Sequence, residues 1–427
     1  MNTMTMETKK PQTCTTPSQN EIVDVQHTSC CVVGGGPAGA ILALLLARKG
    51  VPVTLLEMHK DFDRDFRGDT LHPAVLEIMD QLGLAERLHE LPHSKATGPT
   101  FNFADGPFRP FDLRRLKTKF PYVLMVPQAK FLQFITAEAA KYPAFRLVMG
   151  AGVKQLIQEN GAVRGVRYMA ADGWHELRAE LTVGADGRFS QVRQLTGITP
   201  EKTAPPMDVL WFRLPRLPQD PEVPGGVGGA LGRGRILIVL DRKDYWQAGL
   251  VFAKGHYQEL RSAGISAIRD TIAEIDPHFA PHAAALTDWH QLALLCVESS
   301  CCAQWHKPGV LLIGDAAHAM SPIAGVGINF AIQDAVVTAN LLTNKLKAGR
   351  VTDADLAEVQ RQRRWPTRII QRMQAFFQEN LVEAVLGSSK PQRAPLPLKI
   401  ITRIPLLRNL PGRMFAFGPR RVRVLDV

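Results

Sequence analysis

The first strong pattern along the chain is an apolar run that glycine and proline interrupt. Residues 29–33 are almost wholly apolar, as in a buried strand, and residues 37–49 have the length and composition of an apolar helix. Residues 51–57 predict a second buried strand, which completes a β-α-β unit. Because four glycines and a proline fall within 34–39, a membrane-spanning helix over 30–47 is disfavoured.

Farther along, helical and strand-like periodicities alternate. Helices are predicted over 72–82, 128–141 and 353–383, and another begins near residue 329. Strands are predicted over 153–157, 165–169, 208–214, 235–252 and 310–313, and Asn160-Gly161 marks a tight hairpin between the first two. This order predicts an α/β fold: a Rossmann-like domain, an inserted antiparallel-sheet domain and a C-terminal helical region.

The domain boundaries follow from the same pattern. Residues 1–26 are polar and lack the apolar core of a signal peptide, so we expect a disordered tail and a cytoplasmic protein. The Rossmann-like domain is predicted to comprise 27–100, 121–200 and 290–345, the inserted substrate domain 101–120 and 201–289, and the C-terminal region a long helix over 346–386 and a tail over 387–427.

Composition places the chain among globular proteins, with 45% hydrophobic and 21% charged residues in 427. Most of the net charge of +11 is concentrated at the C-terminal end, because residues 387–427 carry nine Lys or Arg and one acid, Asp426. A nucleic-acid partner is disfavoured because no binding motif accompanies this charge. The basic, apolar tail leaves two alternatives: peripheral contact with an anionic inner-membrane surface, or packing of its apolar residues on the body. The six cysteines show no CxxC spacing, and we expect no metal site.

The glycine-rich segment supplies the first candidate chemistry. Gly34, Gly36 and Gly39 match G-x-G-x-x-G between a strand and a helix, and Pro37 and Ala38 begin that helix. Such a turn lets the backbone approach a pyrophosphate, and the helix N-terminus attracts its negative charge. Glu57 ends the second strand at the spacing where a carboxylate binds ribose hydroxyls, which favours FAD or NAD over NADP.

Two later motifs complete a resemblance. The first is Gly184-Ala185-Asp186-Gly187-Arg188, which continues to Arg193, and the second is Gly314-Asp315-Ala316-Ala317-His318. The second continues through Pro322, Gly325, Gly327, Ile328 and Asn329. Together with Arg67-Gly68 and Gln128, these segments resemble, in order and spacing, the class A flavoprotein monooxygenases, the group of para-hydroxybenzoate hydroxylase and the ubiquinone-biosynthesis hydroxylases.

The resemblance implies a role for each residue. Glu57 would hold the adenosine ribose, Gln128 the ribityl or phosphate part of FAD, and Asp315 the ribityl chain. Residues 65–70 would lie against FAD, with Arg67 foremost and also able to meet the nicotinamide. Ile328 and Asn329 would present N–H groups to the flavin ring. Asp186 would either contact a cofactor or tie its loop through an ion pair with Arg193, and His318 is expected to be structural.

The same resemblance implies the reaction. FAD, reduced by NADH or NADPH, would react with O₂ and hydroxylate a hydrophobic, aromatic or quinone-like molecule through a flavin hydroperoxide. A flavin-dependent reductase or dehydrogenase of a prenylated or polycyclic substrate remains the alternative. A non-enzymatic prenyl-protein carrier of the same fold is disfavoured by Glu57 and Asp315. No catalytic acid or base is assigned. Trp211, Ile238 and Trp246 are the candidate pocket wall, unless they form an ordinary sheet core.

Overall fold

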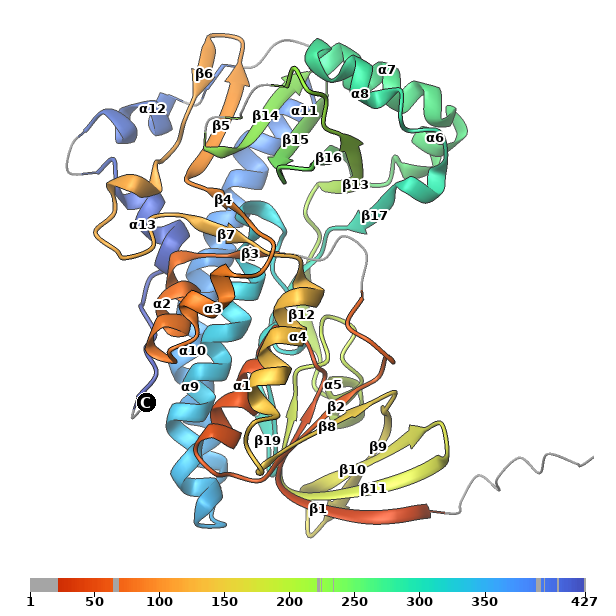
Figure 1. The fold of residues 1–427 in the computed structure, drawn as a ribbon, viewed down its shortest axis with the longest axis vertical. Helices are drawn as coiled ribbons and strands as arrows, with labels where there is room; N and C mark the ends of the chain where they lie inside the picture. Colours follow the sequence, from red (N-terminus) through yellow and green to blue (C-terminus); the bar gives the residue numbers. More distant parts are fainter. Residues whose placement is uncertain are drawn as a thin grey trace, which may run out of the picture.

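The computed structural model has two large sheets that lie toward opposite ends of the molecule, with long helices between and beside them (Figure 1). The description covers residues 22–63, 69–220, 223, 225–232, 234–388, 393–394, 396–404 and 407–425. The arrangement confirms the predicted fold class, a Rossmann-like α/β domain with an inserted sheet domain and a helical C-terminal region.

The Rossmann-like sheet has a parallel centre. Its strand order is β19-β20-β11-β1-β2-β8, and β9 and β10 extend it beside β11. The pairs β20–β11, β11–β1, β1–β2 and β2–β8 are all parallel, so these five strands end at one edge. The strands are β1 (Ile22–Val33), β2 (Val53–Glu57), β8 (Phe145–Met149), β9 (Gly152–Glu159), β10 (Ala162–Ala170), β11 (Gly173–Gly184), β19 (His306–Lys307) and β20 (Val310–Leu312).

Three helices pack together beside this sheet: α1 (Pro37–Arg48), α4 (Gln128–Ala139) and α9 (Gly327–Lys347). Helix α1 packs between the other two and is buried along almost its whole length, because its residues are small or aliphatic. One helical stretch, Ile323–Lys347, is long and apolar enough to cross a membrane, yet 72% of its most apolar window is buried in the protein. That burial is typical of the core helix of a globular protein.

The inserted sheet has seven strands in the order β17-β13-β16-β15-β14-β5-β6. It is antiparallel except at β14–β5, where a strand from an earlier part of the chain joins it in parallel. Its strands are β5 (Gly98–Phe103), β6 (Gly106–Phe108), β13 (Met207–Pro215), β14 (Gly226–Gly232), β15 (Arg235–Asp241), β16 (Tyr245–Ala253) and β17 (Ala293–Cys296). Residues 98–100 and 293–296, expected in the Rossmann-like domain, therefore belong to this sheet.

Helices cover one face of the inserted sheet (Figure 1). They are α6 (Tyr257–Ser262), α7 (Gly264–Ile275) and α8 (Ala280–Ala283), whose apolar residues share a core with alternate residues of β13, β15 and β16. The opposite face, called here the near face, contacts α11 (Glu383–Leu386), α13 (Leu410–Phe417) and the loop before α9. A three-stranded sheet of β3 (Thr70–Leu71), β4 (Ser94–Ala96) and β7 (Val123–Met125) and helices α2 (Pro73–Gln81) and α3 (Ala85–His89) lie between the two domains.

The remaining short elements connect these layers. They are β12 (Pro200–Thr203), β18 (Ser299–Cys302), α5 (Gln191–Thr196), and the 3₁₀ turns Leu113–Arg115, Pro277–Phe279, Trp289–Gln291, Gly314–Ala316 and Ile323–Gly325. Strands β12 and β18 pair antiparallel, so the chain returns to the Rossmann-like domain beside the point where it left.

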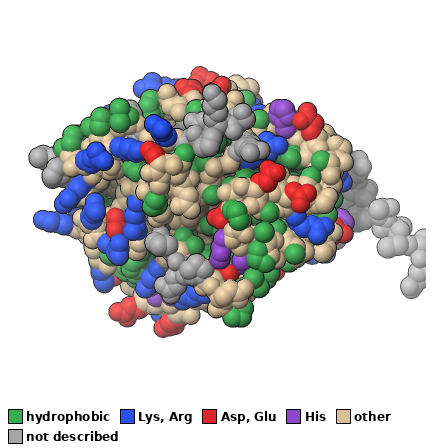
Figure 2. All heavy atoms as spheres, turned by 90° about the horizontal axis from the view of Figure 1, so that it is seen from above, with side chains coloured by type: hydrophobic (Ala, Val, Ile, Leu, Met, Phe, Trp, Pro, Cys, Tyr) green, Lys and Arg blue, Asp and Glu red, His purple; other side chains and the backbone are tan. Residues whose placement is uncertain are grey.

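The C-terminal region differs from the prediction, which was one long helix over 346–386 followed by a tail. Helix α10 (Asp353–Phe377) ends in a π-helical turn, Gln378–Val382, which leads into α11. Within the predicted tail, α12 (Leu396–Arg403) keeps apolar side chains exposed, whereas α13 buries Ala416 and Phe417 on the body. Lys and Arg side chains gather at the side of the molecule where these helices lie (Figure 2). For α13, packing on the body is the correct alternative.

The expected disordered tail over 1–26 is too long. Strand β1 begins at Ile22, and its first residues pair with β11. The hydrophobic pattern missed this extension because polar Asp24 and Gln26 face the protein while Val23 and Val25 are exposed. Asp24 accepts a hydrogen bond from the His175 ring, so a polar network takes the place of apolar packing.

A buried ionic cluster joins α9 and α10 to the loop after β20. The Asp334 carboxylate lies 2.6 Å from His318 Nε2 and 2.6 Å from Arg363 Nε, and all three side chains are at most 1% exposed. It also accepts the Gly314 N–H at 2.9 Å. His318 and Arg363 hold the pKa of Asp334 below its usual value despite its burial. Its contribution to stability is therefore present above the unfolded pKa and is lost only as the pH falls through the lowered folded pKa.

We predict that Asp334→Asn destabilises the fold by about 3–5 kcal/mol, because Arg363 would be left buried without its counterion. Urea unfolding at pH 7 measures this loss. The control is Asp80→Asn, which removes the exposed 2.6 Å pair with Lys119 and should change the free energy of unfolding by about 0–1 kcal/mol. Equal effects of the two substitutions would contradict the importance of the cluster.

Candidate functional site

The carboxyl edge of the parallel sheet brings the sequence motifs together. Strand β1 ends at Val33, directly before the glycine turn, and β2 ends at Glu57. Strand β11 ends at Gly184, at the start of the Asp-Gly motif, and β20 ends two residues before Gly314. In open α/β sheets this edge is where ligands bind. Four segments that are up to 280 residues apart therefore meet at one place.

The glycine turn has the geometry that the motif predicts. Gly34 has φ +104°, and a Cβ there would lie 2.5 Å from the Ala185 carbonyl oxygen. A Cβ on Gly39 would lie 2.0 Å from the Gly34 carbonyl oxygen, so strand and helix meet too closely for any side chain. Gly36 differs, since the nearest atom to its Cβ position is 4.0 Å away. Pro37 and Ala38 follow it as the first helical residues, and the N-terminus of α1 faces this open space.

Glu57 is buried beside this turn. One carboxylate oxygen accepts the Gly35 N–H at 2.8 Å, and the other accepts the His59 N–H at 3.0 Å. The His59 ring lies 2.7 Å from the same oxygen. These contacts hold the carboxylate next to the first turn of α1, where the motif requires an acceptor for a ribose. His59 was not predicted, and no motif in the sequence singles it out.

The Asp-Gly motif organises its own loop. Asp186 accepts hydrogen bonds from the Ser190 hydroxyl and the Val192 N–H, the latter at 3.0 Å, at the start of α5. Burial raises the pKa of Asp186. Arg193 donates to the Ala316 carbonyl at 2.9 Å and to the Arg188 carbonyl at 2.6 Å. Of the two alternatives for Asp186, the ion pair with Arg193 is wrong: each residue binds other groups, and Arg193 joins the Asp-Gly loop to the Gly-Asp loop.

The Gly-Asp motif forms a tight 3₁₀ turn over Gly314–Ala316. Gly314 has φ +59°, and its Cβ position lies 3.2 Å from Ala331 of α9 and 3.3 Å from Ala38 of α1. Asp315 is half-buried on this turn and has interactions within the protein. His318 contacts Asp334 and packs on Trp305 with ring centroids 4.8 Å apart, so its position is structural, as the sequence indicated.

The loop Pro322–Gly327 leads into α9 and is tied to the segment before α2. Thr70 donates its hydroxyl hydrogen to the Gly325 carbonyl at 3.0 Å. Asn329 accepts the His72 N–H at 2.8 Å and donates to the Thr70 and Gly325 carbonyls at 3.2 Å each. Ala324, with φ +66°, is a non-glycine residue in the left-handed region, a strain that is common at functional loops. Asn329 thus uses its side chain to join two loops, and Ile328 lies beside it in the first turn of α9.

Two predicted residues, Arg67 and Gly68, lie outside the described residues. The segment resumes at Asp69, which pairs with the buried Arg242 of the inserted domain. Burial lowers the pKa of Arg242 to about 10, so the guanidinium stays charged at neutral pH. Gln128 begins α4 just after β7, which pairs with β3 beside Asp69. These contacts fix the two domains against each other at the edge of the site.

The predicted pocket wall divides between the two faces of the inserted sheet. Trp211 and Ile238 lie on the near face and are partly exposed. Trp246 was predicted wrongly: it is fully buried on the opposite face, against Phe279, and donates its indole N–H to Asp220 at 2.7 Å. Side chains alternate between faces along a strand, and the aromatic pattern alone did not say which face looks toward the Rossmann-like domain.

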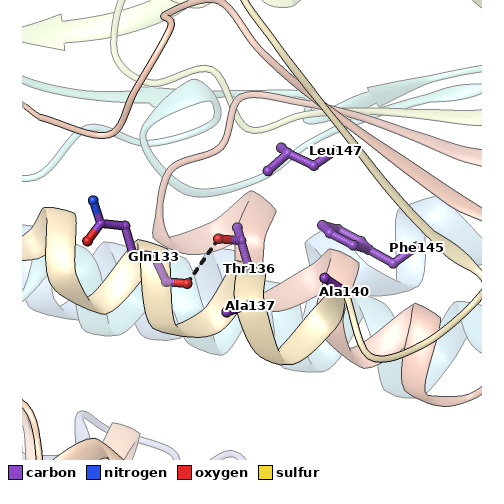
Figure 3. Close-up of a pocket in the computed structure, with 6 residues that line it drawn as sticks. All are labelled: Gln133, Thr136, Ala137, Ala140, Phe145 and Leu147. Carbon is purple, nitrogen blue, oxygen red and sulfur yellow. Dashed lines mark hydrogen bonds between the residues drawn. The ribbon is translucent and has the colours of Figure 1, made fainter.

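Two other features lie apart from these motifs. A hollow of about 400 Å³ between α4 and β8, lined by residues such as Gln133 and Phe145, contains none of the motif residues (Figure 3). Among the described residues, Asp220, His278 and His282 lie close enough together that their side chains could share a metal ion. His282 Nε2 lies 2.8 Å and 2.9 Å from the two Asp220 oxygens, and one of these oxygens also accepts the Trp246 indole. Hydrogen bonds from His282 and Trp246 thus bind both Asp220 oxygens, and His278 lies farther away, with Nε2 3.7 Å from Asp220.

His72 is a site residue that sequence reasoning missed. Its ring is fully buried, with Nδ1 2.8 Å from the Phe415 carbonyl, and it stacks on the Phe415 ring at 4.2 Å. A carbonyl only accepts, so Nδ1 carries the proton in the neutral ring. Burial lowers the pKa of His72 to about 4. Its partner lies 343 residues away, and no local pattern signals such a contact.

We predict that His72 makes the protein less stable in mild acid. Between pH 6.5 and about 4 the unfolded chain binds a proton that the folded chain excludes, so stability is fully present above this window and falls within it. Urea unfolding should show that His72→Asn reduces the stability difference between pH 7 and pH 5 by about 2 kcal/mol. His290→Asn removes a histidine from the exposed surface and is the matched control. An unchanged difference in the His72 variant would refute the assignment.

Comparison with known proteins agrees with this geometry. A family model described as an FAD binding domain matches residues 27–372. Over 405 residues the chain is 32% identical to 6-methylpretetramide 4-monooxygenase from Streptomyces rimosus, covering 94% of this chain and 95% of that protein. It is 25% identical over 334 residues to para-nitrophenol 4-monooxygenase from a Pseudomonas species, covering 75% and 79%.

A solved structure shows the same fold. The anhydrotetracycline hydroxylase from Streptomyces rimosus superposes with a TM-score of 0.72 at 23% identity, covering 92% of this chain and 76% of that chain. The predicted FAD-binding fold is thereby confirmed, and the chain belongs to the class A flavoprotein monooxygenase family.

Proposed function

We propose that this protein is an FAD-dependent monooxygenase that uses NADH or NADPH and O₂ to hydroxylate an aromatic, phenolic small molecule. The observation that carries the proposal is the convergence of the glycine turn, Glu57, the Gly-Asp turn and the α9 loop at one sheet edge. These are the parts that an extended dinucleotide needs, supplied in one place.

The residues present fit FAD. Gly36 leaves open space in front of the N-terminus of α1, which suits a pyrophosphate. Glu57 holds an acceptor next to that turn, which suits the adenosine ribose. Asp315 and Gln128 are proposed to bind the ribityl and phosphate parts, and Pro322–Gly327 with Ile328 to meet the ring. Asp186 is proposed to act through its loop, because it accepts hydrogen bonds from Ser190 and Val192 within that loop.

The first turn of α9 has a further task in this proposal. Its N–H groups have no acceptor within the helix, and the helix dipole places positive charge there. An anionic reduced ring would gain about 0.3–1 kcal/mol at an exposed helix end and up to about 2 kcal/mol at a partly buried one. Bound FAD, reduced by a nicotinamide nucleotide, supplies the electrons that activate O₂. The protein positions the substrate and excludes water.

The proposed substrate class rests on two observations. Trp211 and Ile238 present an apolar, partly exposed surface on the near face of the inserted sheet. The names of relatives give para-nitrophenol and anhydrotetracycline as substrates of those proteins, which supports an aromatic substrate here as well. A planar aromatic ring can stack on the Trp211 indole with centroids about 4.5–7 Å apart.

The experiment that tests the activity is rapid mixing of anaerobically reduced, flavin-loaded protein with oxygenated buffer. We expect a transient absorbance that belongs to neither reduced nor oxidised flavin, before the oxidised spectrum returns. Direct return to the oxidised spectrum, with and without phenolic ligands, would contradict oxygen transfer. It would favour the flavin-dependent reductase instead.

We also predict that Gly36→Ala weakens FAD binding by about 1–3 kcal/mol without unfolding the protein, because the new methyl group would enter the space in front of α1. The backbone at Gly36, with φ −70°, accepts alanine. Equilibrium dialysis against FAD and urea unfolding of the apoprotein separate the two effects. Gly39→Ala is the contrasting variant and should destabilise the apoprotein, because its Cβ would overlap the Gly34 carbonyl. Wild-type affinity in Gly36→Ala would refute the pyrophosphate site.

A further inference from the structure

Helix α13 is docked at a defined position beside the candidate site. The His72 ring donates to the Phe415 carbonyl and stacks on the Phe415 ring. The Phe111 and Phe415 rings lie 4.7 Å apart, and a Cβ on Gly412 would lie 3.3 Å from the Phe111 side chain. A larger residue than glycine at 412 would therefore push the helix away from Phe111. The helix approaches the body as closely as it does because position 412 has no side chain.

The segment after α13 holds the helix in place. Asn340 of α9 donates its amide hydrogen to the Arg423 carbonyl at 2.8 Å and accepts the Leu425 N–H at 3.0 Å. Gln81 of α2 accepts the Val424 N–H at 2.9 Å. Side chains of two different helices thus bind the backbone at 423–425, so the chain is anchored directly after α13.

Phe415 lies where the two halves of the candidate site meet. It shares an apolar cluster with Trp211 and Ile238 of the inserted sheet, and all three side chains stay partly exposed. The Trp211 indole lies over Gly249 of the neighbouring strand β16, where a Cβ would lie 3.0 Å from the ring. On its other side α13 reaches the loop before α9, where Met414 packs against Val326 and Phe330.

We propose that Phe415 is a specificity-determining residue that, with Trp211 and Ile238, bounds the substrate site, and that His72 positions it. The inference rests on the proposed function and adds to it. His72 also binds Asn329 through its backbone N–H, so Phe415 is linked to the start of α9 by a single residue. The aromatic wall then has one side from the sheet and one from the C-terminal segment, and the separation of the two limits the size of a planar substrate.

Three probes of increasing size test the proposal: phenol, 1-naphthol and 1-hydroxyanthraquinone. Their dissociation constants come from the change that each causes in the visible spectrum of the bound flavin. We expect Phe415→Ala to shift the ratio of affinities toward 1-hydroxyanthraquinone, relative to phenol, by about tenfold or more, and Phe415→Trp to shift it in the opposite direction. Phe415→Leu keeps an apolar side chain on His72 and replaces Phe415→Ala if the latter loses its flavin.

The control is Leu410→Ala, a truncation on the same helix at a position 51% exposed to solvent, which should leave the ratio unchanged. An unchanged ratio in all Phe415 variants, with intact probe binding, overturns the proposed role of Phe415 but leaves the proposed function standing. If no probe changes the wild-type flavin spectrum, the aromatic-substrate class fails, and the inference fails with it. The two failures are therefore distinguishable.

The positioning role of His72 has its own readout. His72→Asn keeps an N–H donor near the place of Nδ1, whereas His72→Leu removes it. We expect His72→Leu to shift the phenol-to-anthraquinone ratio in the direction of Phe415→Ala, and His72→Asn to restore at least half of the wild-type ratio. A purely structural role would lower flavin content or stability in both variants and leave the ratio the same.

Discussion

The buried carboxylate of Asp334 is the interaction on which the rest of the site depends. A charge in the interior is stable only when every oxygen has a partner, and here the partners are His318, Arg363 and the Gly314 N–H. These contacts fix the positions of α9, α10 and the turn after β20 relative to one another. Arg193 extends this network, because it binds the Ala316 carbonyl and so joins the Asp-Gly loop to the same turn.

Close packing of small residues then brings two helix N-termini to the same edge. Ala38 of α1 and Ala331 of α9 both lie within 3.3 Å of the Cβ position of Gly314, so larger side chains at these places would separate the helices. Each N-terminus carries unpaired N–H groups and the positive end of a dipole. An anionic dinucleotide is what such an arrangement stabilises, and Glu57 lies beside one of the two ends.

The C-terminal segment packs on both domains, and neither its charge nor its composition reveals this. Arg413, Arg420 and Arg423 are exposed, but α13 packs between α2, the loop before α9 and the near face of the inserted sheet. A segment whose composition suits an anionic membrane surface therefore packs on the body beside the candidate site. The segment has two different sides: Phe415 and Phe417 face the body, whereas Leu407 and Leu410 are exposed to solvent.

The sequence by itself determined the fold class, the glycine turn, Glu57 and the order of the flavin motifs, because each depends on local spacing, backbone freedom or strand-helix periodicity. It also predicted the Asn160-Gly161 hairpin, whose two residues have φ +50° and +76°. Tertiary structure alone decided that Trp246 faces away from the site, that Arg193 binds Ala316 and not Asp186, and that His72 meets Phe415. Contacts between residues distant in sequence depend on which face of an element turns inward and how closely elements approach, and neither is encoded in local periodicity.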